Sequence, residues 1–160
     1  MEKINIEIEM ENGGIIKAEL YPETAPVTVD NFVGLIEDNF FDGLIFHRVI
    51  PGFMIQGGGY DADGNQKEAR SIKGEFDGNG FKNPIKHTRG VLSMARTMFP
   101  NSASSQFFIM HDDAPHLDGQ YAAFGMVTDG MDVVDEIAEA PTGYQDKPVD
   151  DWVIKTIRLA

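Results

Sequence analysis

Three long polar side chains stand among apolar residues: Arg48 in FHRVI, Gln56 in FMIQGG and Gln106 in SSQFFIM. A guanidinium stays charged in a protein, and burying it without a partner costs several kcal/mol. No Asp or Glu lies within five residues of Arg48. An apolar surface with a few placed hydrogen-bond donors is typical of a ligand groove. Together the three residues predict a binding site, although each glutamine taken alone is better explained as the end of a strand.

The chain offers little for covalent or metal chemistry. It has no cysteine, which excludes a thiol nucleophile, a disulfide framework and cysteine-based metal sites. DADGNQ (61–66) starts like a calcium-binding loop, but Gln66 stands where that loop needs glycine. The four histidines include no His-x-x-x-His pair, so we predict no metal and no cofactor. Chain order leaves a Ser–His–Asp triad open, given serines 93, 102, 104 and 105, although there is no Gly-x-Ser-x-Gly turn.

Short apolar segments must position these side chains. INIEIEM (4–10) alternates apolar and polar residues, Asn12-Gly13 is a strong hairpin signal, and IIKAELY returns as a second strand. Apolar residues at helical spacing predict helices over about 26–39 and 131–138. Five glycine-broken runs between 41 and 127, and the C-terminal DWVIKTIRLA, predict further strands. The pattern therefore predicts about eight strands and two helices.

A closed barrel is the expected architecture. The chain shows no internal repeat and no linker, so we predict one mainly β domain over residues 1–160. Many short antiparallel strands manage their edges best by closing into a barrel. Because successive residues of a strand face opposite sides, we expect Met54 and Gln56 on one face and Phe53 and Ile55 on the other.

Composition and charge narrow the class of protein. The formal net charge is −13, from 13 basic and 26 acidic residues, so phosphate backbones would be repelled and we expect no nucleic-acid partner. No run of 18 apolar residues predicts a membrane span. The first residues, MEKINIEIEMENGG, lack the apolar core of a signal peptide. With the lack of cysteine, these features predict a cytoplasmic protein.

Four blocks of the sequence resemble those of a known family. FDGLIFHRVIPGFMIQGG (41–58) resembles the signature segment of the cyclophilins, the peptidyl-prolyl cis-trans isomerases. GVLSMA (90–95), SSQFFIM (104–110) and HLDGQYAAFGMV (116–127) resemble further blocks of that family, in order. SMART (93–97) is similar to compact bacterial members. The resemblance covers essentially the whole chain and implies a closed eight-stranded antiparallel barrel, capped by two helices, with the groove on its outside.

The resemblance implies a peptidyl-prolyl isomerase that acts in protein folding. The expected activity is faster rotation about Xaa-Pro peptide bonds in proline-containing polypeptides, through a hydrogen bond and an apolar pocket that stabilise the twisted amide. No cofactor is implied, and we expect a monomer. Two alternatives stay open: a non-catalytic module that binds proline peptides, and a general chaperone.

The family's site residues transfer by motif. Arg48 matches the catalytic arginine, and His47 matches the histidine beside it. The residues expected to bind substrate are His47, Phe53, Met54, Gln56, Ala95, Arg96, Gln106, Phe108, His116, Leu117 and Tyr121. Among them, the resemblance gives the walls of the proline pocket to Phe53, Met54, Phe108 and Leu117.

Three of these positions depart from the eukaryotic pattern. Arg96 stands in place of an asparagine, in a stretch that meets the peptide largely through backbone atoms. His116 stands where many members have tryptophan, and Tyr121 stands where a histidine is usual. The tryptophan matters for the cyclic inhibitor cyclosporin in the family, so we expect cyclosporin to bind with weakened affinity. None of the changes removes Arg48, so catalysis should survive.

Overall fold

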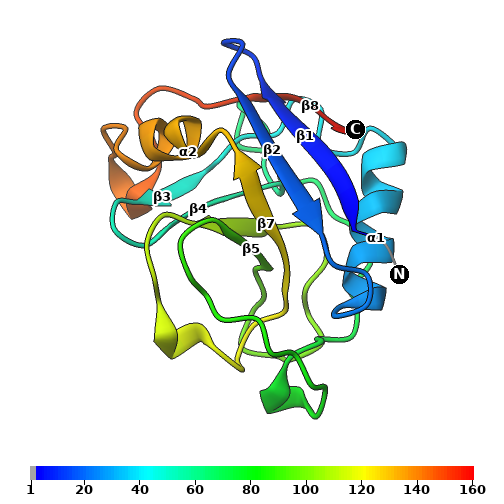
Figure 1. Cartoon of the computed structure of the whole chain (residues 1–160). Helices are drawn as coiled ribbons and strands as arrows, with labels where there is room; N and C mark the ends of the chain where they lie inside the picture. Colours follow the sequence, from blue (N-terminus) through cyan, green and yellow to red (C-terminus); the bar gives the residue numbers. More distant parts are fainter. Residues whose placement is uncertain (1–2) are drawn as a thin grey trace.

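Eight strands and two α-helices make up the fold in the computed structural model, which describes residues 3–160. The strands are β1 (Ile4–Met10), β2 (Ile15–Leu20), β3 (Arg48–Ile50), β4 (Met54–Gly57), β5 (Val91–Met94), β6 (Phe107–Met110), β7 (Ala123–Asp129) and β8 (Ile154–Leu159). The helices are α1 (Pro26–Glu37) and α2 (Met131–Ala138). They lie on opposite sides of the curled sheet (Figure 1). This confirms the mainly β class, the eight antiparallel strands and the two helices.

The prediction of a closed barrel is wrong. All eight strands belong to one antiparallel sheet of order β3-β4-β6-β5-β7-β2-β1-β8, so β3 and β8 are its edges and the sheet is a curled half-barrel. Just before the two edge strands, the chain makes a single bridge between Ile45 and Val153, and the Phe46 N–H donates to the Trp152 carbonyl at 3.1 Å. β3 itself spans 48–50, beyond this contact, so within residues 3–160 no continuous ladder closes the sheet.

The β1–β2 hairpin forms where the sequence predicts it. The Met10 N–H donates to the Gly14 carbonyl at 2.8 Å, and Gly13 adopts φ 96°, which glycine tolerates without a steric cost. Ile6 and Ile8 of β1 are buried, while Glu7 faces the outside. On that outer side Arg158 of β8 binds Glu7 at 2.8 Å. The period-two pattern thus sets which face of this edge of the sheet meets the core.

The core gathers around a phenylalanine of α1. The Phe32 ring is fully buried and lies 5.0 Å from the rings of Phe41 and Phe124, and 5.3 Å from that of Phe107. Edge-on and tilted aromatic contacts of this kind stabilise a core beyond their buried area. The core therefore ties α1 to the inner side of β6 and β7, which leaves the other face of the β3–β4–β6 region available for a site.

A distant carboxylate completes the start of α1. The residue before the helix, Ala25, offers no side-chain cap, and Pro26 occupies the first position. Glu75, which is buried, accepts the N–H groups of Val27 at 3.2 Å and Thr28 at 2.7 Å. It also accepts the Thr28 hydroxyl at 2.7 Å. An anion at a helix N-terminus satisfies its free N–H groups and complements the helix dipole.

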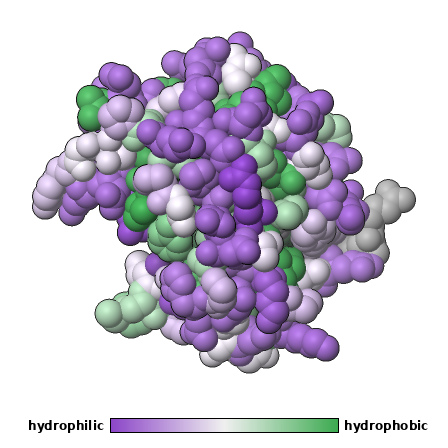
Figure 2. Space-filling view, turned by 60° about the vertical axis from the view of Figure 1, so that its left-hand side comes forward, coloured by the Kyte–Doolittle hydropathy of each residue, from purple (hydrophilic) through white to green (hydrophobic). Residues whose placement is uncertain are grey.

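The face of the molecule drawn in Figure 2 is largely hydrophilic. On the face drawn in Figure 2, hydrophobic residues form separate small patches between hydrophilic ones. Over residues 3–160, neither helix has the length and apolar character that a transmembrane span would need.

Candidate functional site

The strand register brings two of the predicted polar residues, Arg48 and Gln56, into one row with Phe108. Arg48 of β3 pairs with Gln56 of β4, and Gln56 pairs with Phe108 of β6. Phe108 in turn pairs with Ser93 of β5. Residues that are paired across neighbouring strands project to the same face of a sheet. The neighbouring positions, such as Val49, face the opposite way into the core.

A small pocket lies along this row. It has a volume of about 220 Å³, and we call it the Arg48 pocket. Nine of the twelve predicted site residues line it: Arg48, Phe53, Met54, Gln56, Ala95, Arg96, Phe108, Leu117 and Tyr121. Its apolar floor belongs to a hydrophobic cluster, separate from the core, that includes Met54, Phe108 and Leu117. The structure therefore brings most of the predicted residues together around one arginine.

Phe53 lies on the side of the sheet opposite to the one predicted by strict alternation. β4 begins at Met54, so Phe53 belongs to the preceding turn, where the period of two does not apply. It packs against the same outer cluster as Met54, while Ile55 is part of the core. The prediction that Phe53 and Ile55 share one face of the sheet is therefore wrong. Phe53 lies at the pocket because it belongs to the turn before β4.

The three remaining predicted residues lie beside the pocket. Gln106 accepts a hydrogen bond from Gln56 Nε2 at 3.0 Å. His47 packs its ring against Tyr60, with ring centres 4.7 Å apart. His116 is exposed and stacks on Phe53 at 5.8 Å.

The two cations of the pocket, Arg48 and Arg96, differ in how far their donors are occupied. Among residues 3–160 no carboxylate pairs with it, and its hydrogen bond from Nη1 to Gln56 Oε1 is long, at 3.5 Å. Arg96, by contrast, donates from Nη2 to the Gln120 carbonyl at 2.6 Å. Its guanidinium also lies 4.7 Å from the ring centres of both Phe76 and Tyr121. Arg96 thus builds the wall, whereas Arg48 keeps donors free for a ligand.

A Ser–His–Asp chain does form, but beneath the pocket. His87 Nδ1 lies 3.1 Å from Asp118 Oδ1, and His87 Nε2 lies 2.9 Å from Ser93 Oγ. Asp118 accepts only, so Nδ1 carries the proton and Nε2 accepts the Ser93 hydroxyl. Ser93 is fully buried, with 0% exposure, so no substrate carbonyl can reach its hydroxyl. The His87 ring stacks under Phe108, with ring centres 6.0 Å apart. The hydrogen-bonded residues Ser93, His87 and Asp118 therefore support the pocket floor and do not supply a nucleophile.

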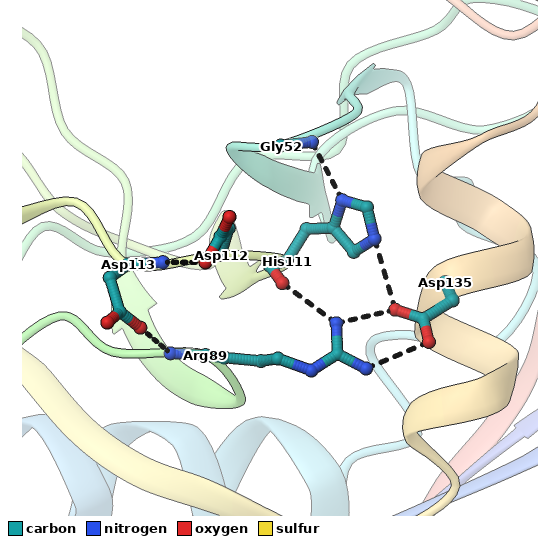
Figure 3. A network of polar contacts seen from close by, with 6 residues as sticks. All are labelled: Gly52, Arg89, His111, Asp112, Asp113 and Asp135. Carbon is teal, nitrogen blue, oxygen red and sulfur yellow. Dashed lines mark hydrogen bonds and ion pairs between the residues drawn. The ribbon is translucent and has the colours of Figure 1, made fainter.

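A second polar network holds the turn that carries Phe53 (Figure 3). His111 Nδ1 accepts the Gly52 N–H at 2.8 Å, and the His111 N–H donates to the Phe53 carbonyl at 2.9 Å. His111 Nε2 lies 3.0 Å from Asp135 of α2. Arg89 binds both carboxylate oxygens of Asp135, at 2.7 and 2.8 Å, and these hydrogen bonds lower the pKa of Asp135. No sequence pattern predicts this link between α2 and the pocket wall.

Comparison with known proteins places the chain in a family. The family model for cyclophilin type peptidyl-prolyl cis-trans isomerase/CLD matches residues 5–159. The chain belongs to this family. It is 50% identical over 145 residues to a peptidyl-prolyl cis-trans isomerase of Acinetobacter baylyi, covering 86% of this chain and 74% of that protein. It is 42% identical over 162 residues to peptidyl-prolyl cis-trans isomerase B of Escherichia coli, covering 93% and 96%.

Solved cyclophilin structures have the same fold. A cyclophilin type peptidyl-prolyl cis-trans isomerase of Cryptosporidium parvum superposes with a TM-score of 0.85 at 30% identity, over 99% of this chain and 98% of that one. The crystal structure of that isomerase in the presence of the dipeptide Ala-Pro gives a TM-score of 0.83 at 31% identity, over 98% of each chain. This chain is therefore a peptidyl-prolyl cis-trans isomerase.

Stability should depend on the protonation of His47. Burial lowers the pKa of its imidazole from 6.5 to about 4, and the charge of Arg48 adds to this effect. A lowered folded-state pKa means that the unfolded chain binds the extra proton first as pH falls. The contribution of the neutral ring is therefore complete above pH 6.5 and is lost as pH falls towards about 4.

His47→Gln should make the unfolding free energy less dependent on pH in that window. The difference in slope between the two proteins is bounded by about 1.4 kcal/mol per pH unit and should be smaller, because the ring is partly exposed. Urea unfolding of both proteins at several pH values between about 4 and 7 measures it. Parallel curves for wild type and variant would contradict the assignment.

Proposed function

We propose that the Arg48 pocket isomerises Xaa-Pro bonds by binding the prolyl amide most tightly when it is twisted. Rotation about a peptide bond is opposed by about 18–20 kcal/mol, because the C–N bond has partial double-bond character. No covalent bond is made or broken in the rotation, so the chemistry calls for neither nucleophile nor general base. A catalyst must instead stabilise the twisted amide more than either planar isomer.

Arg48 is the proposed donor to the prolyl nitrogen. Twisting uncouples the nitrogen lone pair, which then accepts a hydrogen bond that neither planar isomer can accept. A charged donor in a partly dry site provides a strong hydrogen bond of this kind. The observation that carries the proposal is the row Arg48–Gln56–Phe108, which sets a guanidinium without a carboxylate partner among residues 3–160 beside an apolar pocket of about 220 Å³.

The apolar walls are proposed to hold the proline ring while the rest of the peptide rotates. Phe53, Met54, Phe108 and Leu117 line the pocket, and the last three belong to one buried cluster. Two supports restrict the movement of these walls: His87 beneath Phe108, and the His111 network behind Phe53. A rigid pocket holds the proline ring still, so that the bound peptide moves mainly by rotation about the prolyl peptide bond. This is the positioning that such a reaction requires.

Gln56 and Gln106 are proposed to bind the peptide backbone next to the proline. Their side chains are hydrogen-bonded to each other at 3.0 Å, which orients the remaining donor and acceptor atoms along the edge of the pocket. Ala95 is proposed to contribute backbone contacts on the opposite wall. His116 presents only an imidazole against Phe53, which supports the weakened cyclosporin affinity. The monomeric state and the cytoplasmic location stay predictions.

The alternatives receive less support. A chaperone that holds unfolded chains needs a large continuous apolar surface. The face drawn in Figure 2 carries separate small patches and no surface of that kind. A binding module without turnover would keep the pocket but needs no free cation in it, whereas Arg48 has no carboxylate partner among residues 3–160.

NMR exchange spectroscopy on a short Ala-Ala-Pro-Ala peptide tests the proposal. Without a catalyst, cis–trans exchange takes tens to hundreds of seconds. Catalytic amounts of the protein should produce exchange cross-peaks between the cis and trans signals within a mixing time of about a second. Peptide binding, seen as shifts of protein resonances, without faster exchange would show a binding module and overturn the catalytic role.

A further inference from the structure

A second and larger cavity lies next to the Arg48 pocket. We call it the flanking cavity; it has a volume of about 900 Å³, against about 220 Å³ for the pocket. Arg48 lines both hollows, so they meet at this side chain. Gln106, which is hydrogen-bonded to Gln56 of the pocket, also lines the flanking cavity. A polypeptide bound across Arg48 therefore has a continuous path from one hollow into the other.

Large side chains stand open to solvent at the wall of the flanking cavity. Tyr144 is 86% exposed and Val149 is 67% exposed, and both line the hollow. Tyr60 lines it too, with its ring against His47. Isolated exposed apolar residues are ordinary, but several around one hollow mark a surface that a ligand can cover.

The loop that carries Tyr144 is held in an unusual backbone conformation. Gln145 and Asp146 both lie in the left-handed region, at φ 57° and 60°. Residues other than glycine rarely adopt this conformation, and it persists where the surrounding structure enforces it. Here the Gly143 N–H donates to the Lys147 carbonyl at 2.8 Å, which closes the loop. Backbone strain of this kind gathers at binding sites, where it fixes the shape that a ligand meets.

The polar groups of the flanking cavity fit a neutral ligand with a hydrogen-bonding group. Its charged side chains carry both signs, Arg48 and Lys147 against Asp61 and Asp146, so neither an anion nor a cation is favoured. His47 Nδ1 is buried and, within residues 3–160, has no hydrogen-bond partner. A buried polar atom without a partner destabilises the protein unless a ligand or water pairs with it.

We propose that the flanking cavity is a second subsite, which takes a bulky aromatic side chain of the same polypeptide whose proline occupies the Arg48 pocket. The inference rests on the proposed function of that pocket. Aromatic rings of a substrate can pack on Tyr60 and Tyr144 in offset or edge-on contact. An extended chain advances about 3.3–3.6 Å per residue, so the aromatic residue lies within a few positions of the proline.

A series of peptides tests the subsite. The parent is an alanine peptide with one central proline, and each further peptide carries a single tyrosine at one position before or after the proline. For cis–trans isomerisation by the wild type, kcat/KM should be about five- to tenfold higher for the peptide with tyrosine in the matching position than for the parent, through a lower KM. Tyr144→Ala should remove this preference and leave turnover of the parent unchanged. A nuclear Overhauser contact between the peptide ring and Tyr144 gives a second readout.

The matched control is Phe99→Ala. Phe99 is also an exposed aromatic residue, at 68%, but it lines neither hollow, so this variant should keep the preference. Equal efficiency for all tyrosine positions, or a preference that survives Tyr144→Ala, would overturn the subsite. A wild type that does not process even the parent peptide would overturn the proposed function itself, so the two failures are distinguishable.

Discussion

Arg48→Ala is expected to reduce kcat/KM for an Ala-Pro peptide by about 10²- to 10³-fold, the usual effect of removing one donor that acts in the transition state. The loss should appear in kcat, because the hydrogen bond to the nitrogen exists only when the amide is twisted. Peptide affinity should change much less, because the apolar walls around Met54 and Phe108 remain. NMR exchange rates and a peptide titration on the same sample measure the two quantities separately.

Arg48→Lys provides the sharper comparison. It keeps the positive charge but loses the planar fork of donors, so it should lose most of the activity as well. Arg70→Ala, which removes an exposed arginine outside the pocket, is the matched control and should behave as wild type. The unfolding midpoints of all three variants show whether the fold is intact. Near-normal exchange by a folded Arg48→Ala protein would exclude Arg48 as the donor.

The clustering of the candidate site residues could be predicted from the sequence because several of them stand on strands with a clear pattern. Arg48, Gln56 and Phe108 each stand in a short apolar run, and antiparallel pairing brings such runs together on one face. Local composition indicated a polar–apolar groove, and the family resemblance supplied the expected roles, which stay predictions. The helices at 26–37 and 131–138 followed from apolar residues at helical spacing, with errors of two residues at most at their ends.

What the sequence did not show depends on contacts between distant segments. Whether the sheet closes depends on how 43–46 meets 152–154, and this contact stops before β3 begins. The face of Phe53 depends on where a turn ends, which alternation cannot locate. The sequence allows several pairs of a histidine with a serine, and His87 with Ser93 is one of them. Residue type and chain order do not tell whether such a pair supplies a nucleophile or supports the pocket. Burial decides between these roles, and burial is a property of the fold.

Glu75 is the clearest example of such a contact, because nothing around it in EFDGN marks it as a helix cap. It is 1% exposed and lies 47 residues from its partner Thr28. Three donors converge on its carboxylate, from Val27 and from the N–H and hydroxyl of Thr28. Its neighbour Phe76 lies against the guanidinium of Arg96, so the same segment also supports the wall of the Arg48 pocket.

Glu75→Ala should lower the free energy of unfolding by about 3 kcal/mol, because it leaves buried donors unpaired and removes an anion from the helix N-terminus. For a chain of this size the melting temperature should fall by about 6–12 °C. Glu75→Gln keeps the shape and one acceptor oxygen, so its loss should be intermediate. Glu68→Ala, at an exposed position, is the matched control and should be close to neutral. Urea unfolding with an unchanged m-value measures these differences, and equal stability of the Glu75→Ala and Glu68→Ala proteins would show that α1 does not depend on this carboxylate.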